Sequence, residues 1–409
     1  MEYNNLQSLY LVKVEPNANN NKYYRLIPDG DYFDVRYGRI GVANYQTARY
    51  SMSQWDKKLK EKIKKGYENK TELVAETIIT PNKKKEYLDI NNPSIAQIVA
   101  RLQSMARQAI KDNYTINSNL VTVKMIDEAQ LILNNLINTD DVELFNKILV
   151  DLFKTIPRKM GKVKDYLAKT DKDYSEILQR EQDLLDIMKG QVTQHSIEGK
   201  DENENNVTKV ENNKTILDAM GLQFEEVTQE ELKMIKKELG EISNKFYSAW
   251  KVINLKTQER YEKFVTTEKI KDQRLLFHGS RSENIWGIIN LGLVLRPSKV
   301  VINGKMFGFG CYFAPKAMKS LGYTSLSGSR WSNGNSNSGF MALFNVAYGK
   351  PYDVYSFDSK FYNLNYENLQ KMCPGANSLH AHAGSMLYND EIIVYKEEQM
   401  TIKYLIELR

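Results

Sequence analysis

The spacing of apolar residues divides the chain into three stretches. Short alternating runs rich in Tyr and Val, such as residues 9–14 and 22–26, predict antiparallel strands over residues 6–50. From Ser53 onward, apolar residues recur every four positions and predict a helix with one buried stripe. This stripe consists of Trp55, Leu59, Ile63 and Tyr67. The first stretch is therefore expected to form a small sheet with one helix.

Helical spacing governs the middle of the chain, from about residue 92 to residue 192, and predicts an all-α bundle. The expected helices are one opening at Pro93 and others at residues 123–136, 142–153 and 178–188. Residues 195–214 are polar and break the pattern, which indicates a linker or surface loop. Further on, residues 230–250 are expected to be helical and strands dominate afterwards. The fold class is therefore multidomain α+β, with a small sheet-plus-helix domain, a helical bundle and a mixed β/α domain.

Composition limits the class of protein. At 409 residues, with 26% charged and 42% hydrophobic residues, the chain is long enough for two to four soluble domains. Cys311 and Cys373 are its two cysteines, too few for a disulfide framework or a four-cysteine zinc finger. We expect no transmembrane helix and no signal peptide, because long apolar runs and a basic, apolar start are missing.

Positive charge is concentrated near the start of the chain. The net charge is +6, and residues 1–86 hold sixteen Lys and Arg against eleven Asp and Glu. A locally basic domain is compatible with a polyanion partner. It is also typical of a solvated basic face, and charge alone favours this simpler interpretation.

Three short apolar runs near the end of the chain each carry one residue of chemical use. These residues are His278, Tyr312 and Glu391. Strands place such side chains on the wall of a site, where distant segments can converge. His278 is one of only four histidines in the chain.

Two other kinds of site are not expected from the residues. The glycines around Phe309 lack the third glycine and the following helix of a dinucleotide-binding loop. His380 and His382 alternate as on a strand, and no cysteine or third histidine stands where it could complete a metal site. We therefore predict no metal and take these two histidines as surface residues.

The last two hundred residues resemble the ADP-ribosyltransferase domain of the poly(ADP-ribose) polymerases. The resemblance rests on several motifs in the same order. They are His278-Gly279-Ser280-Arg281 with Asn284, Met306-Phe307-Gly308, Gly310-x-Tyr312-Phe313-Ala314, Lys319-Ser320-x-x-Tyr323 and Asp390-Glu391-x-Ile393-Val394-Tyr395. It implies an enzyme that uses NAD as its substrate and needs no metal.

The resemblance also implies a role for each residue of the NAD site. Gly279 and Ser320 would hydrogen-bond the carboxamide, while Tyr323 and Tyr312 would flank the nicotinamide ring. His278 would bind the adenine ribose. Further residues of the NAD site would be Ser280, Asn284 and Ala314.

Glu391 would grip the nicotinamide ribose, stabilise the cationic transition state and orient the acceptor hydroxyl. With His278 and Tyr312 it makes up the family's polymer-forming set and the expected catalytic residues. Met306 would help Glu391 to form the acceptor site.

The N-terminal stretch resembles a WGR domain, with Tyr37-Gly38-Arg39 where the family has Trp-Gly-Arg. Tyr and Trp are both flat, amphipathic rings, so a stacking role can survive. Tyr37 and Arg39 would then contact DNA. The helical stretch resembles the family's regulatory domain. The expected boundaries are 1–82 for the WGR-like domain, 88–200 for the regulatory domain, 201–214 for a polar linker and 215–409 for the catalytic domain.

The resulting hypothesis is a poly(ADP-ribosyl)transferase stimulated by DNA strand breaks, with a role in DNA repair. Its partners would be broken DNA and protein acceptors, and the need for an accessory factor stays open; no membrane partner is expected. It would act in the nucleus of a eukaryotic cell, or otherwise at DNA in the cytoplasm. Two alternatives remain open: a mono-ADP-ribosyltransferase and a catalytically silent DNA-end scaffold.

Overall fold

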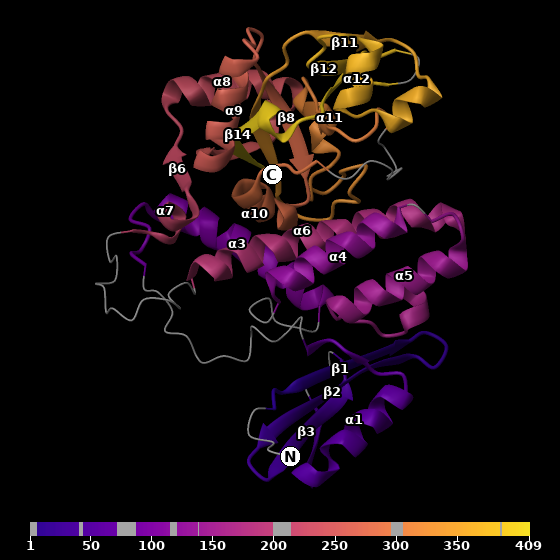
Figure 1. Cartoon of the computed structure of the whole chain (residues 1–409). Helices are drawn as coiled ribbons and strands as arrows, with labels where there is room; N and C mark the ends of the chain where they lie inside the picture. Colours follow the sequence, from indigo (N-terminus) through magenta and orange to yellow (C-terminus); the bar gives the residue numbers. More distant parts are fainter. Residues whose placement is uncertain are drawn as a thin grey trace. The chain divides into compact units, whose positions relative to one another are not determined.

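The structure is a computed structural model that divides into two compact units (Figure 1). One unit comprises Met1–Lys83 and Arg107–His195, and the other comprises Lys84–Ala106 and Ser196–Arg409. The structure describes residues 6–40, 44–71, 87–114, 121–137, 139–198, 214–295, 306–384 and 387–409. The polar linker expected at 201–214 lies outside these residues except for Lys214.

The N-terminal sheet is antiparallel, with the strand order β4-β3-β2-β1-β5. Its strands are β1 (Leu9–Glu15), β2 (Asn20–Asp29), β3 (Tyr32–Arg39), β4 (Gln46–Ser51) and β5 (Glu68–Asn69). One short 3-10 turn, η1 (Met52–Gln54), leads into helix α1 (Trp55–Lys64). Phe33 and Trp55 meet edge to face, with ring centroids 5.1 Å apart, in a core shared by sheet and helix.

Helix α1 begins two residues later than the sequence pattern predicts. Its N-cap is Gln54, whose side chain makes no capping hydrogen bond, and the hydroxyls of Ser51 and Ser53 lie 3.1 Å from each other. Ser53 therefore does not cap the helix. Ile63, expected in the buried stripe, is exposed.

Besides α1 and the end of α3 (Pro93–Asn113), the helices described in the first unit are α4 (Val123–Leu136), α5 (Val142–Thr155) and most of α6 (Tyr174–Glu198), with the turns η4 (Val163–Tyr166) and η5 (Asp171–Asp173). Thr122 and Asp141 cap α4 and α5 by accepting backbone N–H bonds, the arrangement that satisfies a free helix end. Gln130 and Gln182 exchange amide hydrogen bonds between α4 and α6. Figure 1 shows these helices side by side in magenta.

The second unit holds two sheets. The larger has the order β6-β7-β14-β10-β8 and is antiparallel, and the smaller has the order β11-β12-β13-β9. The larger sheet consists of β6 (Leu222–Glu226), β7 (Phe246–Asn254), β8 (Arg274–Ser280), β10 (Gly339–Val346) and β14 (Met400–Leu408). The smaller sheet consists of β9 (Cys311–Phe313), β11 (Pro351–Val354), β12 (Ser378–Ala381) and β13 (Glu391–Val394), of which β11 and β12 are parallel.

Helices and short turns surround these sheets, as Figure 1 shows in colours from rose to yellow. They are α7 (Ile216–Met220), α8 (Gln229–Leu239), η6 (Gly240–Lys245), α9 (Leu255–Thr267), α10 (Ser282–Leu291), α11 (Ala317–Leu321), η7 (Ser359–Asn363), α12 (Tyr366–Met372) and η8 (Glu397–Gln399). The start of helix α3 (Pro93–Asn113), up to Ala106, belongs to the same unit. Among the residues that the structure describes, no helix is long and apolar enough to cross a bilayer.

The prediction of one helix over residues 230–250 is wrong in its second half. Helix α8 ends at Leu239, because Gly240 follows with a φ of +53° that other residues rarely adopt. Trp250 lies in β7 opposite Leu405 of β14. The predicted fold class is nevertheless confirmed: an N-terminal sheet, a helical middle region and a mixed β/α C-terminal region.

Candidate active site

Three strands bring the predicted catalytic residues together. Strands β9 and β13 pair directly, with Tyr312 opposite Ile393. Glu391 is the first residue of β13, two positions before Ile393. Two backbone hydrogen bonds of 2.9 Å link Phe277 of β8 to Ala314, just after β9. His278 Nδ1 lies 3.0 Å from the Tyr312 carbonyl oxygen. The two sheets therefore meet where the sequence predicts convergence.

Glu391 is paired with a lysine that the sequence did not single out for a role. Lys319 Nζ, on α11, lies 2.5 Å from Glu391 Oε1, and the two side chains are 13% and 8% exposed. The same ammonium donates to the Asn389 carbonyl. Burial raises the pKa of the Glu391 carboxyl, and Lys319 opposes that rise. Lys319 therefore favours the charged form of a carboxylate that lies in a largely dry position.

Gly279 is required by the close approach of β8 and α11. A Cβ atom at this position would stand 1.9 Å from the carbonyl oxygen of Ser320, a buried residue of α11. The carboxamide contact expected of Gly279 already gives one reason for a glycine, since a ligand must approach its backbone closely. The structure adds a second reason, because protein backbone already fills the space of a side chain.

Tyr312 is fixed at its hydroxyl. The oxygen accepts the Phe307 N–H at 3.0 Å and donates to the Gly308 carbonyl at 2.9 Å. Burial, together with the charge of Glu391, raises the pKa of the phenol well above its ordinary value. Met306 and Tyr312 pack, both partly buried, against the same apolar cluster. The Tyr312 ring is therefore a rigid wall beside Glu391.

Tyr323 has an aromatic neighbour that the sequence did not identify. Its ring lies 6.3 Å from that of Trp331 at an angle of 23°. Burial and the charge of Glu391 raise the pKa of Tyr323 to about 12. The Trp331 N–H donates to the Gly322 carbonyl at 2.8 Å, so this loop is tied back onto the end of α11. One face of Tyr323 is thus stacked on protein.

Ser280 and Asn284 lie at the junction of β8 and α10. The Asn284 amide donates to the Ser280 hydroxyl at 3.2 Å. Ala314 is buried by its bridge to β8. All eight residues predicted to bind NAD therefore lie on β8, β9, α10, α11 or the residues next to them.

In the first unit, Arg39 contacts protein carbonyls. Its guanidinium donates to the carbonyls of Asn19 at 2.9 Å, Gly161 at 2.7 Å and Met160 at 3.4 Å. The side-chain amide of Asn21, which is buried, donates to the Arg158 carbonyl at 3.1 Å. The sheet is thereby joined to the segment between α5 and η4.

Tyr37, the other residue predicted to contact DNA, belongs to an aromatic group. Its ring lies 5.6 Å from that of Tyr24, and the ammonium of Lys62 lies 4.0 Å from the Tyr24 ring centre and 5.8 Å from the Tyr37 ring centre. Tyr37 is partly buried against the core of the N-terminal domain. Its ring is thus half embedded in the domain.

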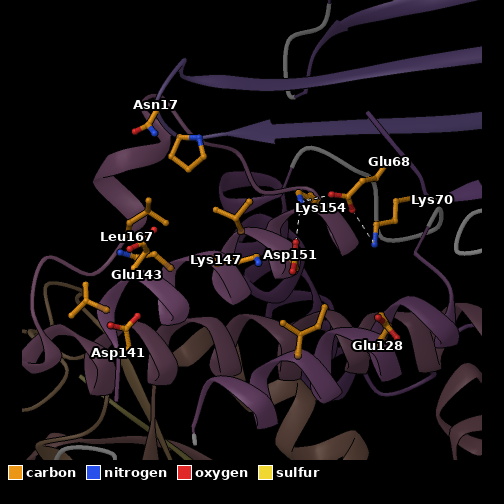
Figure 2. Close-up of a pocket in the computed structure, with 15 residues that line it drawn as sticks. Asn17, Glu68, Lys70, Glu128, Asp141, Glu143, Lys147, Asp151, Lys154 and Leu167 are labelled. Carbon is orange, nitrogen blue, oxygen red and sulfur yellow. Dashed lines mark hydrogen bonds and ion pairs between the residues drawn. The ribbon is translucent and has the colours of Figure 1, made fainter. Parts of the chain in front are cut away.

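A cavity of about 1080 Å³ lies in the first unit, and Figure 2 shows its lining. Five carboxylates and three lysines line it, so its charge does not suit a polyanion. None of the residues predicted to bind NAD or DNA borders it. The charged side chains include the pair Lys154–Glu68, with Nζ 2.5 Å from the carboxylate.

Comparisons with known proteins agree with the geometry. Residues 229–409 match the family described as "Poly(ADP-ribose) polymerase catalytic domain", and residues 7–74 match the "WGR domain". The chain is 34% identical to the poly [ADP-ribose] polymerase-like protein 100L of Invertebrate iridescent virus 6 over 168 residues, which cover 40% of this chain and 87% of that protein.

Two cellular relatives show the same likeness over smaller shares of their length. Poly [ADP-ribose] polymerase 2-A of Oryza sativa subsp. japonica is 29% identical, covering 45% of this chain and 31% of that protein. Poly [ADP-ribose] polymerase 2 of Homo sapiens is 30% identical, covering 36% of this chain and 28% of that protein. With its catalytic and WGR domains, the chain belongs to the poly(ADP-ribose) polymerase family and is an ADP-ribosyltransferase whose substrate is NAD.

Proposed function

We propose that this enzyme builds poly(ADP-ribose) chains and that DNA strand breaks stimulate it. The observation that carries the proposal is the buried Glu391 carboxylate, held by Lys319 beside Tyr312 and His278. A fixed negative charge is what an oxocarbenium-like transition state requires.

The transfer step follows from this arrangement. The bond between the ribose carbon and the nicotinamide nitrogen breaks, and nicotinamide leaves with the electron pair, which neutralises its ring. Positive charge grows on the ribose, next to the Glu391 carboxylate. The acceptor hydroxyl then bonds to that carbon, and its proton passes to the carboxylate and on to water.

The other roles extend the proposal residue by residue. Gly279 and Ser320 bind the carboxamide, and Tyr312 and Tyr323 flank the nicotinamide. The hydroxyl bonds of Tyr312 and the Trp331 stack on Tyr323 support these roles, since each ring is held before substrate arrives.

The adenosine end of NAD lies against the other residues of β8 and its surroundings in this proposal. His278 binds the adenine ribose, with Ser280, Asn284 and Ala314 nearby. The bond between Asn284 and Ser280 supports a common site for these two polar side chains. Met306 lies at the acceptor side, together with Glu391.

DNA stimulation is assigned to the N-terminal domain, over residues 1–82. Its basic surface supports contact with DNA phosphates, and Tyr37 stacks on an exposed base or sugar. Arg39 receives a second role, because its bonds to the carbonyls of Met160 and Gly161 join this domain to the regulatory domain over residues 88–200. DNA binding at the sheet can thereby disturb the helices, which control the catalytic domain over residues 215–409.

The cellular setting follows from this function. Protein side chains and growing ADP-ribose chains are the acceptors, and the work is DNA repair, in the nucleus of a eukaryotic cell or otherwise at DNA in the cytoplasm. Labelled NAD, incubated with the enzyme with and without nicked DNA and followed by a denaturing gel, tests the proposal. A DNA-dependent smear supports polymer synthesis, a sharp band supports mono-transfer, and no label favours a scaffold.

A further inference from the structure

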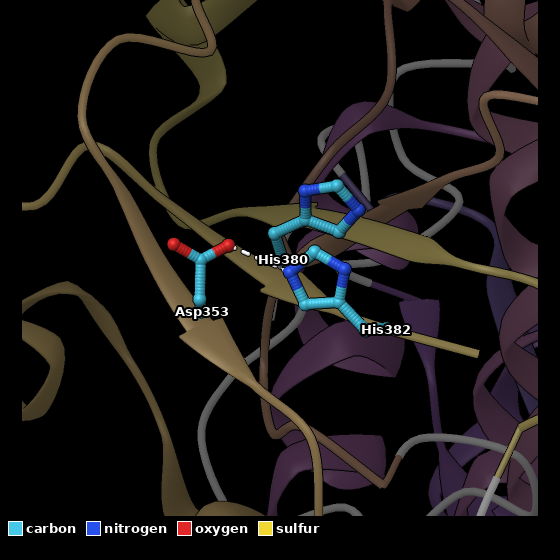
Figure 3. Close-up of side chains that lie close together, drawn as sticks. All are labelled: Asp353, His380 and His382. Carbon is cyan, nitrogen blue, oxygen red and sulfur yellow. Dashed lines mark hydrogen bonds and ion pairs between the residues drawn. The ribbon is translucent and has the colours of Figure 1, made fainter. Parts of the chain in front are cut away.

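Two histidines and two aspartates gather at the smaller sheet, and Figure 3 shows the histidines with one of the aspartates, Asp353. The rings of His380 and His382 lie face to face, with centroids 4.0 Å apart at 19°. Asp353 of β11 is aligned with His380 across the parallel pair β11–β12. Donor atoms of Asp353, His380 and His382 all lie within 4.8 Å of one another. Asp390, just before β13, approaches both rings.

The distances suit ligands of one small cation. Asp390 Oδ2 lies 3.0 Å from His380 Nε2 and 3.9 Å from His382 Nδ1. Ligands at about 2.0 Å from a tetrahedral zinc ion stand about 3.3 Å from one another. The observed spacings bracket that value.

The other nitrogen of each ring already has a partner. His382 Nε2 lies 2.7 Å from Asp353 Oδ1, and His380 Nδ1 lies 2.9 Å from the Tyr348 hydroxyl. Histidines that bind metals are oriented in this way, with the second nitrogen held by a carboxylate or another oxygen. Each ring is therefore fixed on one side and faces Asp390 on the other.

We propose that this cluster is a binding site for one divalent transition metal ion, zinc above all. His380 Nε2, His382 Nδ1 and the Asp390 carboxylate are the ligands, and Asp353 and Tyr348 orient the rings. Two imidazoles and a carboxylate are a ligand set typical of zinc, with water in the fourth position. The sequence predicts no metal here because no cysteine or third histidine stands where it could complete a site, whereas strand pairing brings the two aspartates to the rings.

The metal has a structural consequence that does not depend on the transferase reaction. Asp390 directly precedes Glu391, and Glu391 pairs with Ala381 of β12 between the two histidines. An ion held by His380, His382 and Asp390 cross-links β12 to the start of β13. It therefore stabilises the sheet that carries Glu391.

Zinc chloride, titrated into the chelator-treated full chain and followed by calorimetry, tests the proposal. We expect one ion per chain in the wild type and at least a tenfold loss of affinity in His380→Ala, His382→Ala and Asp390→Asn. His195→Ala is the matched control, because it removes a histidine that is distant in sequence from the cluster. We expect it to bind zinc as the wild type does. Cobalt should give the visible absorption of tetrahedral nitrogen and oxygen coordination in the wild type and in His195→Ala, but not in the three ligand variants.

The orienting residues give a graded result. Tyr348→Phe and Asp353→Asn should bind zinc about 10–100-fold more weakly, since each leaves the ligands in place and frees one ring. Zinc should raise the unfolding temperature of the wild type and of His195→Ala, and leave that of His380→Ala unchanged. Circular dichroism confirms that each variant is folded, and glutamine at the same position, as in His380→Gln, replaces an alanine variant that is not.

Two results overturn the proposal. The first is a wild-type chain that binds no zinc, which leaves a hydrogen-bonded histidine–aspartate network. The second is binding that His380→Gln, His382→Ala and Asp390→Asn retain at wild-type strength, which places the ion elsewhere. Neither result touches the assignment of the NAD site, because calorimetry does not depend on transfer.

Discussion

The ammonium of Lys319 lies 2.5 Å from the carboxylate of Glu391, and both side chains are largely buried. A buried carboxylate tends to take up a proton, because burial disfavours its charged form. Lys319 counteracts this tendency. The pair therefore sets the pH range in which Glu391 is charged and can stabilise a cation.

The pH dependence of transfer follows from the direction of this pKa. Burial raises the pKa of Glu391 above its ordinary value, and catalysis needs the ionised form, so the rate falls as the pH drops through that raised pKa. Lys319→Met removes the opposing charge, and the acid limb of the profile should move to higher pH. Lys316→Met, on an exposed neighbour, is the control. An unshifted acid limb in Lys319→Met contradicts the coupling.

Glu391→Gln should slow transfer far more than it weakens the binding of NAD. The positive charge that the carboxylate meets exists mainly in the transition state, so NAD affinity should change little. Chain growth should fall by about a hundred- to a thousandfold. Gel analysis of the product and calorimetry with NAD measure the two effects. Long polymer made by this variant would show that Glu391 is not the group that stabilises the charge.

Gly279→Ala should damage the site through the backbone. The new methyl group would overlap the Ser320 carbonyl, so α11 must move away from β8. We expect a loss of about 1–3 kcal/mol in unfolding free energy and weaker NAD binding. Gly161→Ala, at a glycine with open space around its Cβ position, should lose far less. Equal stability of the two variants would be inconsistent with the close contact.

The sequence identified the strands of the site but not all of its contacts. His278, Tyr312 and Glu391 stand in short apolar runs, and these runs are β8, β9 and β13. Lys319 and Trp331 gain their importance from the packing of α11 and the following loop. Spacing along the chain does not reveal that Lys319 contacts Glu391 or that Trp331 stacks on Tyr323.

Local patterns failed where tertiary context decides. The Lys- and Glu-rich run before Gly240 has helical spacing, and the pattern of apolar residues extends the predicted helix to Trp250. Strand pairing with β14 fixes Trp250 instead. Similarly, the charge and motif of Arg39 predict contact with DNA. Its bonds to Met160 and Gly161, however, depend on a segment more than a hundred residues away.

Arg39→Ala should affect activation by DNA more than DNA affinity. The variant loses the bonds to Met160 and Gly161 and one positive charge near the proposed DNA surface. We expect activity without DNA to persist, stimulation by nicked DNA to fall severalfold and the salt dependence of binding to decrease slightly. Arg36→Ala, on the same strand, is the control and should lose affinity without losing stimulation at saturating DNA. If saturating DNA stimulates Arg39→Ala normally, Arg39 does not couple the two domains and its role is limited to contact with DNA phosphates.

The start of helix α3 is attached to the catalytic sheet by a buried charge pair. The Arg101 guanidinium lies 2.8 Å from the carboxylate of Glu407 on β14, a side chain that is fully buried. The same guanidinium lies 4.9 Å from the Phe340 ring centre. Trp250 of β7 adds a hydrogen bond of 3.1 Å to Ser94. If the helices restrain the enzyme, this attachment is where the restraint reaches the catalytic domain.

Arg101→Ala should therefore raise transfer in the absence of DNA. Glu407 keeps Arg409 as a partner at 3.0 Å, so the fold should survive with a loss of about 1–3 kcal/mol. Arg107→Ala, at an exposed position of the same helix, is the matched control and should stay dependent on DNA. Hydrogen exchange over residues 93–106 should accelerate in Arg101→Ala, as it should in the wild type when nicked DNA binds. Faster exchange in Arg101→Ala without any activity in the absence of DNA would mean that α3 is a passive spacer, since its release would then leave NAD transfer unchanged.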